Sequence, residues 1–134
     1  MKRLLFAVSI LVVLGSCQVN IIEPRYDARD KVTGYYAMEE FSATFNDYTY
    51  YTVQVTKYGN TGNEIYLDNF YGADIQVMAY VNGEKITIPY QVVDDYEIEG
   101  TGTMQGLNVS LNYSVRDLYN HTQTNFCETR GNRK

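Results

Sequence analysis

Most of the chain beyond residue 30 follows a two-residue alternation of apolar and polar side chains. The clearest case alternates Leu107, Val109, Leu111, Tyr113 and Val115 with Asn108, Ser110, Asn112 and Ser114. Successive side chains of a β-strand point to opposite faces of the sheet, so this pattern is typical of a half-buried strand. Helical spacing of apolar residues is hard to find anywhere after Lys31.

Two further apolar rows, at 75–81 and 86–90, flank the dipeptide Asn82-Gly83. Asn-Gly is favoured at the two positive-φ positions of a tight hairpin turn, which predicts that these strands pair antiparallel. Other strands are expected at 35–44, 49–58, 64–70, 96–103 and 122–129, the last of which carries Phe126.

These segments add up to about eight strands, spaced roughly 10 to 12 residues apart and joined by tight turns. We expect an all-β antiparallel meander over 31–134 that closes into a small barrel or folds into a sandwich, because an open sheet would leave long unpaired edges. The barrel is slightly favoured. We interpret Gly100, Gly102 and Gly106 as sites of strand curvature or close backbone packing, since no helix follows that could complete a phosphate-binding loop.

The N-terminal segment has a different pattern. Met1-Lys2-Arg3 is basic, and the eleven residues from Leu4 to Leu14 are apolar except for Ser9. A membrane-spanning helix needs about 20 apolar residues, whereas the centre of a secretory signal needs about 7 to 15. We therefore expect residues 1–16 to be an export signal and residues 17–30 to form a tether before the single β domain.

The sequence Leu14-Gly15-Ser16-Cys17 resembles the lipobox of bacterial lipoproteins. The resemblance implies that Cys17 is acylated and becomes the first residue of the mature chain, which ties the protein to a membrane. Gln18 follows the cysteine where retained enterobacterial lipoproteins usually have Asp, which favours the outer membrane. The alternative is a plain signal peptide in which Cys17 has no role.

The segments "RDKVTGYYAMEE" at 29–40, "GEKITIPYQ" at 83–91 and 96–120 together resemble the small lipidated, lipocalin-like (calycin-like) β proteins common in Bacteroidetes. The resemblance covers most of the mature chain and implies a compact barrel-like domain but no reaction. Gly34-Tyr35-Tyr36 stands where lipocalins have Gly-x-Trp, and the chain contains no tryptophan.

Charge narrows the possible partners. Without Lys2 and Arg3 the eleven basic residues become nine, against sixteen acidic ones, so the chain from Cys17 onward has a net charge of −7. Nucleic acid is not expected as a partner, because its phosphates are bound mainly by clustered Lys and Arg. The expected partners are the membrane through Cys17 and an envelope protein, a glycan or a small apolar ligand. No cofactor is expected.

Apart from Cys17, the chain has one cysteine, Cys127, and one histidine, His121. On one extended strand they would lie about 20 Å apart, too far for a general base to reach a thiol. They are also too few to hold zinc. We expect Cys127 to be a shielded thiol or a site of intermolecular disulfide formation.

Carboxylates offer a second possibility. Glu97 and Glu99 would share one strand face at roughly 7 Å, a separation that inverting glycosidases use. The alternative is that both are solvated. Asp68, Asn69 and Asp74 could bind calcium, but their spacing does not follow the known loop pattern. No metal site is expected.

All fourteen tyrosines follow the signal segment. Tyrosine combines apolar area with a hydroxyl group, so it serves both half-buried strands and recognition surfaces. The candidates for a recognition surface are Tyr48, Tyr50, Tyr51, Tyr66 and Tyr71.

The sequence favours a lipid-anchored, non-enzymatic binding or docking domain of the cell envelope. The alternatives are a carboxylate-dependent hydrolase of envelope glycans and a structural component of an envelope complex. A barrel with an apolar cavity would favour ligand carriage, a filled barrel with exposed aromatic residues would favour docking, and a cleft with a buried Glu97 or Glu99 would favour catalysis.

Overall fold

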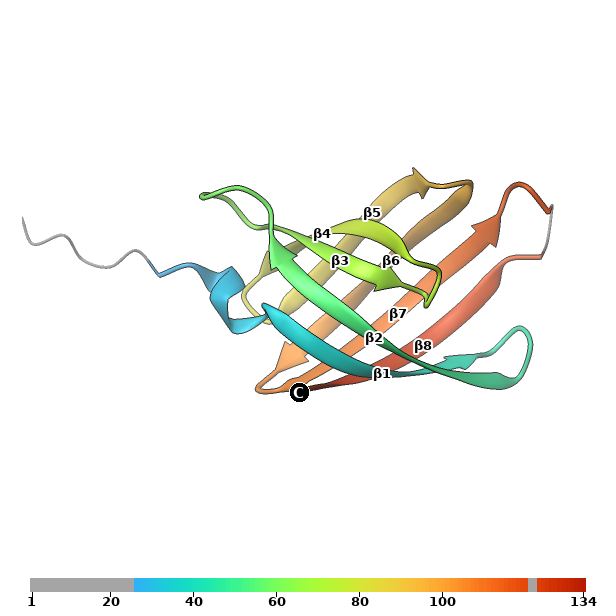
Figure 1. Cartoon of the computed structure of the whole chain (residues 1–134), viewed down its shortest axis with the longest axis horizontal. Coiled ribbons are helices and arrows are strands. Elements are labelled where there is room, and N and C mark those ends of the chain that lie inside the picture. The colour runs from blue at the N-terminus through green and yellow to red at the C-terminus, as the bar shows by residue number, and fades with distance from the viewer. Residues whose placement is uncertain (1–25, 121–122) are drawn as a thin grey trace, which may run out of the picture.

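Eight antiparallel strands close into a barrel in the computed structural model, which describes residues 26–120 and 123–134 (Figure 1). The all-β fold class is confirmed. The elements are η1 (Ala28–Lys31), β1 (Gly34–Ser42), β2 (Asp47–Lys57), β3 (Glu64–Phe70), β4 (Ile75–Asn82), β5 (Lys85–Val93), β6 (Tyr96–Gln105), β7 (Asn108–Asp117) and β8 (Asn125–Arg133). Each strand pairs with the next, and β8 pairs with β1, which closes the barrel. The β2–β3 pairing involves only residues 54–57 of β2, and the β4–β5 pairing only residues 80–82 of β4.

The barrel has two distinct ends (Figure 1). At the first, which we call the entry end, η1 leads into β1 and the chain leaves β8, with the β2–β3, β4–β5 and β6–β7 connections beside them. At the opposite, distal end lie the β1–β2, β3–β4, β5–β6 and β7–β8 connections. The two ends differ in the chemistry of the side chains that they enclose.

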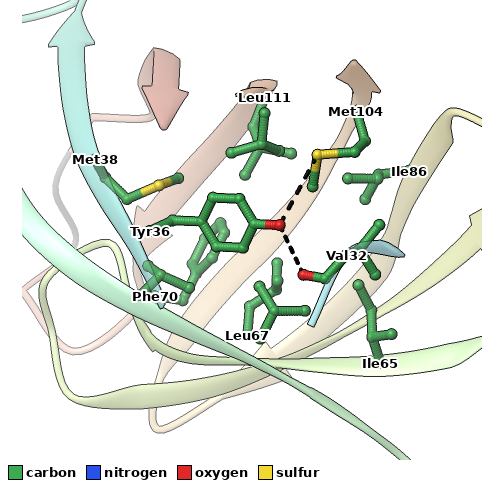
Figure 2. Close-up of a pocket in the computed structure, with 12 residues that line it drawn as sticks. Val32, Tyr36, Met38, Ile65, Leu67, Phe70, Ile86, Met104 and Leu111 are labelled. Carbon is green, nitrogen blue, oxygen red and sulfur yellow. Dashed lines mark hydrogen bonds between the residues drawn. The ribbon is translucent and has the colours of Figure 1, made fainter. Parts of the chain in front are cut away.

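Apolar side chains fill the half of the interior next to the entry end. Tyr36 lies at its centre, where its hydroxyl donates to the carbonyl of Val32 at 2.9 Å and lies 3.9 Å from the sulfur of Met104 (Figure 2). The space left among these side chains is a cavity of about 10 Å³. That is about the room one water molecule needs, as expected for eight strands whose interior is just wide enough for side chains.

Arg29 closes the entry end. It is fully buried, and its guanidinium donates to the carbonyls of Tyr58 at 2.6 Å and Glu64 at 3.1 Å. The same group holds the carboxylate of Asp27 at 2.8 and 3.0 Å, while Asp27 also accepts from the Arg29 backbone amide. The packed part of the chain thus includes residues from the segment expected to be a tether.

Two local predictions about turns are wrong. Asn82 pairs with Lys85, so the turn residues are Gly83 and Glu84, and of these only Gly83 has a positive φ, of 62°. This turn needs one left-handed residue rather than two, and the glycine supplies it. Leu107 does not begin the inward row of β7, because it is the second residue of the turn that starts at Gly106 and is 62% exposed.

The last strand is shifted from its predicted range. β8 spans Asn125–Arg133 instead of 122–129, and Phe126 points outward with 60% of its surface exposed. The inward row consists of Asn125, Cys127, Thr129 and Gly131. This row is mostly polar because it faces a polar cluster inside the barrel, so alternation of apolar residues could not reveal its orientation.

Gly100 and Gly102 on the inner face of β6 allow β7 to approach closely, as predicted. A Cβ atom at Gly100 would lie 2.4 Å from the Cβ of Tyr113, and one at Gly102 would lie 2.3 Å from the carbonyl oxygen of Ser110. Gly106 has a different role, since it supplies a turn residue with a φ of 60° and has no close neighbour.

Replacing Gly100 by alanine should destabilise the fold. The added methyl group meets Tyr113, whose side chain cannot shift without disturbing the interior, so we expect Gly100→Ala to lower the free energy of unfolding by about 1–3 kcal/mol. Urea unfolding followed by circular dichroism measures the change. Thr101→Ala, at the next and exposed position, is the control, and equal stability of the two variants would contradict the packing argument.

Asp27 should make stability depend on pH in the acid range. The hydrogen bond from Arg29 lowers the pKa of Asp27 from 3.8 to about 2. A carboxyl group with a lower pKa in the folded chain stabilises the fold above its unfolded pKa, and this contribution is lost as the pH falls through the folded value. Asp27→Asn should therefore lower the urea midpoint at neutral pH.

The difference in urea midpoint between Asp27→Asn and wild type should disappear as the pH falls from about 4 to about 2, because the protonated carboxyl group and the amide are both uncharged. Urea midpoints measured across this range test the prediction. A difference of constant size down to about pH 2 would show that the effect of Asp27 does not come from its charge.

Candidate functional site

The half of the interior next to the distal end contains a polar cluster organised around Glu40 of β1, beside buried apolar side chains such as Phe70 and Ile98. Glu40 is only 3% exposed. Its Oε2 atom accepts hydrogen bonds from the hydroxyl groups of Tyr51 at 2.5 Å, Tyr113, and Thr129 at 3.3 Å. Donors from β2, β7 and β8 thus converge on one carboxylate, which satisfies the general requirement that a buried polar group be hydrogen-bonded.

The tyrosines around Glu40 remain donors. Burial and then the nearby Glu40 carboxylate raise the pKa of Tyr51 far above its usual value. Burial likewise raises the pKa of Tyr113, with Tyr51 and Glu40 as further causes. Both hydroxyl groups therefore keep their protons and share them within the cluster, where their oxygen atoms lie 3.0 Å apart.

A second layer of polar contacts lies closer to the distal mouth. The hydroxyl of Ser42 donates to Asn125 at 2.5 Å, and the amide of Asn125 donates to the hydroxyl of Tyr71 at 2.7 Å. The ring of Tyr71 packs edge-on against Tyr96 and Tyr113, with centroids 6.2 and 6.5 Å away. Tyr71 has a φ of 60°, a conformation unusual for a bulky residue, and these contacts hold it over the mouth.

The polar groups of this cluster are partnered within the protein. Among the described residues, no buried side-chain nitrogen or oxygen lacks a hydrogen-bond partner. A binding site for a polar ligand normally leaves donors or acceptors free to meet it, so the cluster fills the barrel rather than offering a pocket.

Cys127 is a free thiol with 3% of its surface exposed, in agreement with the expected shielded thiol. Burial, and next the Glu40 carboxylate, raise its pKa far above the usual value, which suppresses the reactive thiolate. A disulfide to another chain would require the barrel to open. His121 and Cys17 lie outside the described residues, so the distance from His121 to Cys127 is not defined.

The five candidate recognition tyrosines divide between the two faces of the sheet. Tyr51 and Tyr71 point inward and belong to the polar cluster. Tyr48 and Tyr50 lie on the outer face of β2 and are 59% and 70% exposed. Tyr66 lies on the outer face of β3 against Tyr58, with ring centroids 5.2 Å apart. Only Tyr48 and Tyr50 lie together on one open surface.

The outer face around Tyr48 and Tyr50 is hollowed. Tyr50 lies opposite Glu39 of β1, and the small Ala37 is the next outward residue of that strand. Together with Thr52 and Arg130 they line an open depression of about 600 Å³. Nearby, the ring of Tyr48 packs against Phe41, with centroids 5.0 Å apart.

Glu97 and Glu99 both lie on the outer face of β6, as expected from their spacing. The guanidinium of Arg116 contacts Glu97 at 2.5 Å, and this hydrogen bond is the main cause that lowers the pKa of Glu97. Glu99 is exposed. The two carboxyl groups therefore do not line a buried cleft.

Two of the three side chains considered for calcium, those of Asp68 and Asn69, make contacts within the protein. Asp68 accepts from Gln76 at 2.7 Å, and Asn69 donates to the carbonyl of Thr52 and accepts from the amide of Asp74. Among the described residues, no group of three or more His, Cys, Asp or Glu side chains could hold a metal ion.

Sequence reasoning missed Glu40, Ser42, Asn125 and Thr129. The signal was present in β1, where Glu40 and Ser42 follow Tyr36 and Met38 at the same two-residue spacing. Polar residues on the inward side of a strand indicate a buried network, and strand β8 continues it with Asn125 and Thr129.

No protein-family model matches the chain, and comparison with curated proteins finds no similar sequence. Within the part of the chain that the structure describes, no helix has the length and apolar character needed to cross a bilayer.

Removing one hydrogen-bond donor from the polar cluster around Glu40 should destabilise the fold. Tyr113→Phe leaves the buried Glu40 carboxylate with one hydrogen bond fewer, and bonds to charged groups contribute about 1.5–3 kcal/mol, so we expect a loss of stability of that size. Urea unfolding measures it. Tyr50→Phe makes the same chemical change on the outer face and should stay within about 0.5 kcal/mol of wild type. Similar values for both variants would argue against a network centred on Glu40.

Proposed function

We propose that this protein is a lipid-anchored envelope protein whose barrel docks onto another molecule through its outer surface and catalyses no reaction. The observation that carries the proposal is the filled interior. The interior leaves a cavity of about 10 Å³ among its apolar side chains, and among the described residues no buried side-chain nitrogen or oxygen lacks a partner. A carrier of small apolar ligands needs a cavity of about 300 Å³ or more.

The outer surface has exposed aromatic side chains and an open depression that a partner could contact. Tyr48 and Tyr50 expose rigid, amphipathic rings that cost little side-chain entropy when they bind. The depression beside Tyr50 gives a partner a place to insert a side chain or a sugar. A role as a structural component of an envelope complex uses the same surface and is included in this proposal.

The anchor is the second part of the proposal. The short apolar segment and Leu14-Gly15-Ser16-Cys17 support lipidation of Cys17 and attachment to the outer membrane. The described chain enters the barrel through η1 at the entry end, opposite the distal end (Figure 1).

The hydrolase alternative has less support. A glycosidase of the expected kind needs one carboxyl group that is protonated and one that is not. Arg116 lowers the pKa of Glu97, which disfavours the protonated form that the acid must supply, and Glu99 lies exposed on the outer face of the barrel.

Substitution of Cys17 tests the anchor. Wild type should enter the detergent-rich phase when cells are fractionated with a phase-separating detergent, because acyl chains bind micelles. Cys17→Ala should stay in the aqueous phase. Mass spectrometry of the purified wild type should show a mature chain that begins with an acylated Cys17.

Identical partition of wild type and Cys17→Ala would refute lipidation, as would an intact Met1 terminus on the native protein. The second thiol provides the matched control. Cys127→Ser removes the buried cysteine and should leave the partition into detergent unchanged.

A further inference from the structure

A trough runs along the outer face of β7. Its floor consists of the short polar side chains of Asn108, Ser110, Asn112 and Ser114, which alternate with the inward row of this strand. Longer side chains of β6 and β8 form the walls, since Glu99 lies opposite Ser114 and Phe126 lies on its other side. From Asn108 to Arg116 the trough is about 26 Å long at 3.3 Å per residue, enough for an extended segment of about eight residues.

The trough consists of adjoining hollows. Two of them, of about 360 and 300 Å³, occupy the distal part and share Glu99, Ser114 and Phe126. A third, of about 290 Å³, continues toward the entry end beside Ser110 and Arg130. The ring of Phe126 is 60% exposed between the first two hollows, and Tyr90 of β5, 61% exposed, lines the second.

Uncompensated negative charge lines the distal part of the trough. Glu99 stands on one wall and Glu128 on the other, each exposed. Within residues 26–120 and 123–134, no Lys or Arg forms an ion pair with either of them, and Arg116 is engaged by Glu97. Two free carboxylates and an exposed aromatic ring face the same space.

The surrounding surface has the same polarity. The distal strand ends and turns carry Asp47, Asp74, Asp94, Asp95 and Asp117, and Arg116 is the only described Lys or Arg among them. Most of the other described basic residues, Lys31, Lys57, Lys85, Arg133 and Lys134, lie at the entry end. The field of the barrel therefore attracts cations to its distal end.

We propose that the β7 trough binds an extended, basic segment of a partner protein. The Lys or Arg side chains of that segment contact Glu99 and Glu128, and their aliphatic stems cover Phe126 and Tyr90. Because β7 is paired with β6 on one side and with β8 on the other, the side chains of the trough make the contacts instead of added backbone pairing. This inference goes beyond the docking role proposed above, because the trough lies on a different part of the outer surface from Tyr48 and Tyr50.

Charge complementarity distinguishes a basic peptide from a neutral glycan. A sugar would use Phe126 as a stacking platform and the Ser and Asn floor for hydrogen bonds, without need of two unpaired carboxylates. A cationic segment uses the carboxylates, the ring and the acidic surroundings together, and its association is accelerated by the long-range field.

The probe is a fluorescently labelled peptide of eight residues that alternates lysine with serine, and fluorescence anisotropy reports its binding to the purified full-length chain. We expect saturable binding that weakens with added salt. The double variant Glu99→Gln, Glu128→Gln should raise Kd about fivefold or more, and Phe126→Ser should raise it about threefold or more.

The matched control is Glu64→Gln, Glu84→Gln, which removes the same charge at the entry end and should change Kd less than about twofold. Circular dichroism verifies that each variant is folded. If the two double variants weakened peptide binding equally, the proposal would be overturned, because the peptide would then respond to the net charge of the barrel and not to the trough. Absence of saturable peptide binding would overturn it too.

A neutral chitin hexasaccharide serves as the competing probe. If it binds in the trough and the lysine peptide does not, the partner is a glycan, and the basic segment is excluded while the docking role stands. The fractionation of Cys17→Ala tests lipidation independently of this assay, because peptide binding is measured in solution and does not depend on lipidation.

Discussion

The narrow interior of an eight-stranded barrel is the constraint on which the rest of this structure depends. Eight strands enclose a space that side chains alone can fill, so every inward residue must pack against its neighbours or find a polar partner. The chain meets this requirement differently in its two halves. Around Tyr36 it packs apolar side chains with almost no space left, and around Glu40 it builds a network of hydroxyl and amide groups.

The polar cluster links strands that apolar packing would hold less specifically. Glu40 of β1 is bonded to β2, β7 and β8 at once, so the strands that flank the closing seam share one acceptor. A network of this kind is favourable only when all its members are satisfied. The unusual backbone of Tyr71 fits this demand, because its left-handed conformation brings the hydroxyl to Asn125 and the ring over the mouth.

The parts of the fold that follow from alternation could be predicted from the sequence. β7 has an apolar inner row and a polar outer row, and the closed meander follows from the number and spacing of such strands. β8 could not be oriented in this way, since its inner row contains Asn125 and Thr129 and its outer row contains Phe126. The β5–β6 turn at Asp94 and Asp95 was also hidden, because both residues adopt positive φ without a glycine to indicate it. Among the tyrosines, the alternation of β2 puts Tyr51 in the same row as Val53 and Val55, but its hydrogen bond to Glu40 could not be predicted from this spacing.

The seam between the first and last strands determines when the molecule can finish folding. β8 pairs with β1 across roughly 90 intervening residues, and the entropy of closing so long a loop must be overcome before the pairing is gained. A nascent chain without β8 therefore exposes two strand edges, of β1 and β7, which are prone to aggregation. Such a chain depends on chaperones, or on prompt completion of synthesis, until its final strand emerges.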